Sequence, residues 1–177
     1  PNAFVKDIQS VTILDIIEAK SLKKSDGTRH ELLEPKANET ELQFAERVIE
    51  RFKEPLPRLY EGLHRAKSGL SFNELSEDAN GISPIADIAS VSLIDTDRCV
   101  YATIAYQEGD RSQYNRIHID ERIFNLPDAK FSKMNRAVTF LHEITYKFLR
   151  MRYDIKDSRT ARIFVSKFLQ KDLRLEE

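Results

Sequence analysis

The hydrophobic residues change their spacing twice along the chain, and this change restricts the folds that the chain can adopt. Residues 39–52 ("ETELQFAERVIERF") carry a helical stripe, whereas "IADIASVSLI" and "VYATIAY", within residues 85–106, are rich in β-branched and aromatic residues and show alternation. Helical spacing returns between residues 132 and 153. This order predicts an α+β protein in which a small, mostly antiparallel sheet packs on helices.

Five helices are expected. They cover residues 11–22 with Ser10 as N-cap, 39–52, 58–66, 133 to about 153 with Ser132 as N-cap, and 160–170. Residues 85–106 are expected to form a hairpin, and residues 114–124 ("YNRIHIDERIF") a third strand at the edge of the sheet. The connection at residues 67–84 is rich in turn formers. We expect one domain over residues 1–177, with a mostly helical layer to residue 80 and the sheet plus two helices at 82–170.

The composition excludes several classes of protein. The 177 residues are 41% hydrophobic and 32% charged, with a net charge of -1, so the totals give no reason to expect a nucleic-acid partner. No apolar run approaches the roughly 20 residues that cross a bilayer. Cys99 is the only cysteine, which excludes an internal disulfide. The chain begins at Pro1 without a signal peptide, which fits a processed product.

The segment "FLHEITYKFL", residues 140–149, carries the candidate site. His142 and Tyr146 are one helical turn apart, so their rings can converge, and Glu143 follows the histidine. A His-Glu pair followed by a second histidine four positions after the first is typical of zinc peptidases, where the glutamate activates the metal-bound water. Tyr146 replaces that second histidine here, so a metal site would need further ligands, for which His118 and Asp157 are the nearest candidates. No cofactor is assured, and zinc is the metal that such a site would hold.

The same helix also has a structural interpretation, which its residue types favour over a metal site. On a helical wheel His142 lies at the boundary of the apolar face, and Thr139, Glu143, Lys147 and Arg150 lie on the polar side. In this interpretation His142 is hydrogen-bonded to a neighbour and Glu143 is exposed.

Four segments, "ISPIADIASVSLI", "IHIDERIFN", "LHEITYKF" and "KDSRTAR", resemble a group of exported bacterial proteins of unassigned function. The resemblance covers roughly residues 82–165 and implies an exported or periplasmic location without supplying an activity. The order of strand, loop and His-Glu helix also resembles a zincin core. Within "KDSRTAR", Asp157 would be a late metal ligand and Arg159 its support, or Asp157 and Ser158 would cap the last helix.

Two functions remain open. In the first, a metal-dependent peptide hydrolase uses His142 as ligand, Glu143 as general base and Tyr146 as ligand or oxyanion donor, and Asp157 or His118 completes the site. In the second, the fold is kept without catalysis. His142, Tyr146 and Asp157 then form a buried hydrogen-bond network, and the strand edge or a cleft binds an unidentified protein or peptide.

Overall fold

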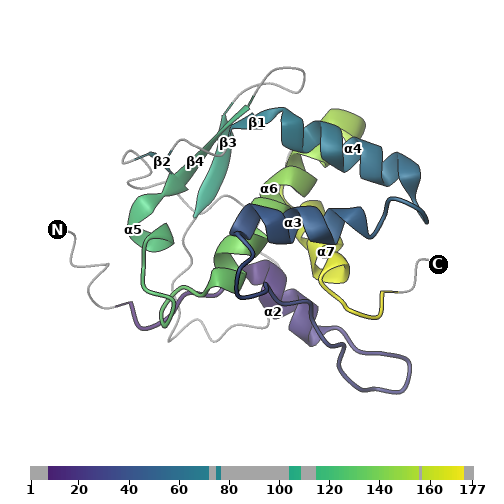
Figure 1. The fold of residues 1–177 in the computed structure, drawn as a ribbon, viewed down its shortest axis with the longest axis horizontal. Helices are drawn as coiled ribbons and strands as arrows, with labels where there is room; N and C mark the ends of the chain where they lie inside the picture. Colours follow the sequence, from purple (N-terminus) through teal and green to yellow (C-terminus); the bar gives the residue numbers. More distant parts are fainter. Residues whose placement is uncertain (1–7, 72–74, 77–103, 109–114, 156, 174–177) are drawn as a thin grey trace.

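A computed structural model describes residues 8–71, 75–76, 104–108, 115–155 and 157–173, and shows an α+β architecture (Figure 1). The helices are α2 (Leu14–Ser21), α3 (Glu41–Glu50), α4 (Pro57–Ser68), α5 (Glu121–Phe124), α6 (Lys133–Tyr153) and α7 (Arg159–Phe168). The strands are β1 (Leu70–Ser71), β2 (Leu75–Ser76), β3 (Ala105–Glu108) and β4 (Asn115–Asp120). No described helix has the length and apolar character needed to cross a membrane.

Helix α6 lies at the centre of the fold and contacts α2, α3, α4, α7 and β3 (Figure 1). Its side chains Val138, Leu141 and Ile144 are buried in one hydrophobic cluster with residues of α3, α4 and β4. Thr139, Glu143 and Lys147, three of the four residues expected on its polar side, are buried as well, and Arg150 is half-buried. Glu143 is 5% exposed and Lys147 is 2% exposed, so the expectation of an exposed Glu143 is wrong. The reason is tertiary, because β3 packs against a helix that is covered on several sides.

The sheet is mixed. Strand β4 pairs in parallel with β1 and β2, with Leu70 opposite Asn115 and Leu75 opposite Ile119. It pairs antiparallel with β3, where Tyr106 lies opposite His118. Strand β4 therefore has partners along both sides, and the expectation of an edge strand is wrong. Residues 121–124, expected to extend the strand, form α5 instead. Most of the hairpin expected at residues 85–106, including Cys99, lies outside the described residues.

The first backbone amides of two helices are satisfied in different ways. Helix α3 begins after Thr40, whose hydroxyl accepts from the Gln43 amide while the Gln43 side chain accepts from the Thr40 amide, a complete capping box. Helix α2 begins after Ile13 and has no side-chain cap, so Ser10 is not its N-cap. The Ile13 amide donates instead to Asn135 Oδ1 at 3.0 Å. The Asn135 side chain on α6 therefore accepts the hydrogen bond of a backbone amide that a capping side chain nearby in the sequence would otherwise accept.

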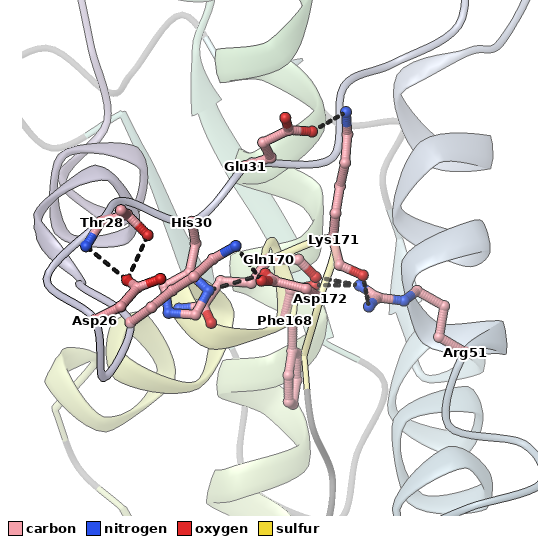
Figure 2. Close-up of polar contacts among 10 residues, drawn as sticks. Asp26, Thr28, His30, Glu31, Arg51, Phe168, Gln170, Lys171 and Asp172 are labelled. Carbon is pink, nitrogen blue, oxygen red and sulfur yellow. Dashed lines mark hydrogen bonds and ion pairs between the residues drawn. The ribbon is translucent and has the colours of Figure 1, made fainter.

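Hydrogen bonds hold the segment after α7 against the first half of the chain (Figure 2). The Arg51 guanidinium donates to the carbonyl oxygens of Phe168, Gln170 and Lys171 at 2.9–3.1 Å. Two backbone bonds, Leu33 N–H to Leu169 O and Lys171 N–H to Glu31 O, add a short antiparallel ladder. These contacts satisfy the carbonyl oxygen of Phe168 at the end of α7 and carbonyl oxygens of the segment that follows it.

Candidate functional site

The imidazole of His142 is held by a carboxylate from another helix. His142 Nδ1–H donates to Asp15 Oδ1 at 2.7 Å, and both side chains are largely buried. Asp15 lies in the first turn of α2. One turn further along α2, Glu18 accepts from Arg162 Nε on α7 at 2.9 Å. The two acidic side chains therefore join α2 to both C-terminal helices.

The ion pair determines the charge of His142. Burial alone lowers the pKa of the imidazole, but the charge of Asp15 and its hydrogen bond outweigh burial and raise that pKa to about 9. His142 is therefore an imidazolium at neutral pH. In this form both ring nitrogens carry protons, and neither offers a lone pair to a metal ion.

Glu143 lies on a different side of the helix from its neighbour. Gln107 on β3 donates through Nε2 to both the Glu143 backbone oxygen, at 2.6 Å, and its carboxylate, at 2.9 Å. Burial raises the pKa of the Glu143 carboxyl, partly offset by the charge of His142 and the hydrogen bond from Gln107. The carboxyl is thus a component of the contact between α6 and the sheet.

Tyr146 is a neighbour of His142, as the one-turn spacing predicts. The ring centroids lie 6.4 Å apart, and the Arg150 guanidinium lies 5.6 Å from the centre of the Tyr146 ring. The tyrosine therefore sits between the buried imidazolium and an arginine near the end of α6, with its ring face toward a cation.

The other candidate residues lie on two separate elements. His118 projects from β4, where its ring stacks on that of Tyr106 with centroids 4.6 Å apart and an interplanar angle of 10°. Asp157 is exposed, and its carboxylate accepts from the Arg159 amide two residues further along the chain, at 3.1 Å. Ser158 is the N-cap residue by position, although its side chain makes no capping bond, and the Arg159 side chain is exposed.

No group of three or more His, Cys, Asp and Glu side chains in the described part of the chain is arranged to hold a metal ion. The most promising donor, His142, has one carboxylate at its Nδ1 atom. This geometry fits an ion pair between two helices. It does not supply the three protein ligands that a catalytic zinc site uses.

Three residues of this region were missed by sequence reasoning. Asp15 lies within the apolar run "TILDII", and a charge at such a position is a signal for a buried partner. Lys147 follows Glu143 by one turn, so burial of one would have suggested burial of the other. Nothing in the sequence around Gln107 indicates its role, because that role depends on the packing of β3 against α6.

The chain matches no protein-family model, and comparisons with curated proteins and with solved structures also find no match.

Proposed function

We propose that this chain is a non-catalytic, exported bacterial protein that keeps a zincin-like helix and binds a protein or peptide partner. One observation carries the proposal. The two residues of the His-Glu pair are directed to different buried partners, His142 to Asp15 on α2 and Glu143 to Gln107 on β3. Both side chains thereby stabilise contacts between elements, which is a structural role.

The geometry disfavours peptidase chemistry for a definite reason. A glutamate that activates a zinc-bound water must share a solvent-accessible point with the histidine that binds the zinc. Here the Glu143 carboxylate is buried against the sheet. A zinc ion would also have to displace a proton from an imidazolium whose pKa is about 9.

The alternative is a metal-dependent hydrolase of peptide bonds, with His142 as ligand and Glu143 as general base. One observation favours it. A carboxylate at the second nitrogen of a histidine is an arrangement that often supports a metal ligand, and Asp15 occupies that place. Metal content therefore separates the two functions.

The test is elemental mass spectrometry of protein purified without chelator or metal-binding tag, with and without added zinc. Three chains are compared: the wild type, His142→Ala and the control His64→Ala, whose histidine is exposed on α4. We expect no stoichiometric zinc in any of them and no cleavage of a peptide library. Near-stoichiometric zinc that is lost only in His142→Ala, with cleavage lost in Glu143→Gln, would overturn the proposal.

Export is supported by the resemblance of residues 82–165 to exported proteins. Fractionation of the source bacterium with an antibody to this chain tests it. We expect the protein in the periplasmic or extracellular fraction, and recovery in the cytoplasm alone would contradict export.

A further inference from the structure

A short basic hairpin, residues 22–30, extends from the end of α2 (Figure 1). Its two arms meet at an antiparallel bridge between Lys23 and Arg29. Local bonds shape its turn. Asp26 Oδ1 accepts from the amide and the hydroxyl of Thr28 at 2.8 and 2.6 Å, and Gly27 adopts a φ of 83°. The hairpin is thus organised before any partner arrives.

The two faces of the basic hairpin have different surroundings. Lys24 Nζ and His30 Nδ1 both contact Asp172, at 2.6 and 2.9 Å, which anchors one face to the segment after α7 (Figure 2). Hydrogen bonds from Lys24 and His30 hold the pKa of Asp172 below its ordinary value, so it remains ionised. Lys24 therefore has a permanent anion beside it, and His30 has a hydrogen-bond partner.

Lys23 and Arg29 occupy the alternate positions, so their side chains point away from Asp172. Opposite residues of a bridge project on the same side, which places these two cations next to each other. Both are exposed, and neither has an ion pair with any residue that the structure describes.

Like charges directly opposite one another destabilise an antiparallel pair. Acidic residues at either position would have removed the repulsion within the free protein. An anion placed between Lys23 and Arg29 would remove it on binding, in the way that Asp172 serves Lys24 and His30 on the other face.

We propose that Lys23 and Arg29 form the docking point for an acidic segment, rich in Asp or Glu, of a protein partner. This inference rests on the proposed function as a binding protein and names its surface and the class of its partner. Charge complementarity carries the assignment, because carboxylates fit two adjacent cations.

The chemistry of the basic hairpin favours an acidic protein segment over the other polyanions. Nucleic-acid binding needs several phosphate contacts and often aromatic side chains for stacking. Residues 20–31 contain no Phe, Tyr or Trp, and their one aromatic ring, His30, is turned toward Asp172. Stable attachment to an anionic membrane needs a larger cluster of cations or an inserted apolar face.

The probe is a fluorescein-labelled decaglutamate peptide, titrated at low ionic strength and followed by fluorescence anisotropy. Decaglutamine, decathymidylate and phosphatidylglycerol vesicles serve as comparison ligands. We expect decaglutamate binding to weaken about tenfold or more in Lys23→Glu/Arg29→Glu. It should change less than about twofold in Arg58→Glu/Arg65→Glu, which carries the same charge change on exposed residues of α4.

The single variant Lys23→Glu covers the case in which the double variant fails to fold. It replaces a like-charge pair by an opposite pair, so we expect weaker decaglutamate binding with an unchanged or higher thermal midpoint. The wild type failing to bind decaglutamate, equal losses in both double variants, or tighter binding of the oligonucleotide or vesicles would each overturn the inference. None of these outcomes touches His142 or Glu143, so they are distinct from the zinc and cleavage results that would overturn the proposed function.

Discussion

His142 on α6 and Asp15 on α2 form a buried ion pair of 2.7 Å across 127 residues of sequence. The pKa of His142 is raised from 6.5 to about 9, so the pair's contribution to stability is complete below pH 6.5 and is lost as the pH rises through 9. We expect the free energy of unfolding to fall by on the order of 3 kcal/mol between neutral pH and about pH 10. Urea denaturation at a series of pH values measures this.

The control for this pH dependence is Asp15→Asn, because a neutral amide does not hold the imidazolium. We expect it to lower stability at pH 7 by about 3 kcal/mol, since a buried cation loses its partner. Its stability should then vary much less than that of the wild type across the alkaline range. An equally steep decline in Asp15→Asn would show that other groups cause the pH dependence.

Glu143→Gln should preserve or increase stability. Because burial raises the pKa of Glu143, the stability that this carboxyl contributes is present below pH 4.5 and is lost as the pH rises through its folded-state pKa. A glutamine has no charge to bury and still accepts from Gln107. We expect a gain of about 1 kcal/mol at pH 7, measured by chemical denaturation. Glu61→Gln, at an exposed position of α4, should have no effect, and a destabilised Glu143→Gln would refute the argument.

Arg51→Met removes the donors that hold the segment after α7. We expect a loss of about 2 kcal/mol, because three carbonyl oxygens lose a charged hydrogen-bond donor. Hydrogen exchange should quicken at the amides of Leu33 and Lys171, which form the adjacent ladder. Lys53→Met is the matched control, since Lys53 is exposed and its ammonium makes a 3.9 Å ion pair with Glu50 and a 5.8 Å contact with the Tyr60 ring, neither of which involves the segment after α7. Unchanged exchange at both amides would contradict this role for Arg51.

Gly62→Ala should destabilise the protein although alanine favours helices. A Cβ atom at position 62 of α4 would collide with the ring of Phe148 on α6. We expect a cost of about 2 kcal/mol instead of the gain of about 1 kcal/mol typical of an exposed helix. A double-mutant cycle with Phe148→Leu measures the coupling. Additive effects in that cycle would mean that the ring is not the obstacle.

Helices formed by local signals could be predicted from the sequence. Helix α6 begins after Ser132 and ends at Tyr153 as its pattern indicates. In the apolar stripe expected within residues 39–52, Ala45, Val48, Ile49 and Phe52 are buried and Leu42 is half-buried. Helix α2 begins later than its pattern indicates, because the amide of its N-cap residue Ile13 is satisfied by Asn135, 122 residues away. The residues around Ile13 give no indication of a hydrogen-bond partner so far away in the sequence.

The sheet and the candidate site depended on long-range pairing and were harder to predict. Strands β1 and β2 have two residues each and lie in a segment whose Gly, Asn and Ser content indicates a connector. Without them β4 looked like an edge strand. The spacing of His142 and Tyr146 predicted their proximity, whereas the choice of Asp15 as partner came from the packing of α2.

The hydrogen bonds and ion pairs that join residues 168–172 to residues 24–51 affect how the chain can fold while the ribosome makes it. Helix α2 is made early, yet its main contacts are with α6 and α7, and Lys171 closes a backbone bond to Glu31 across 140 residues. The ribosome must therefore deliver almost the whole described chain before its first helix can dock. Until then the apolar faces of α2 and α3 stay without the packing partners that cover them in the folded protein.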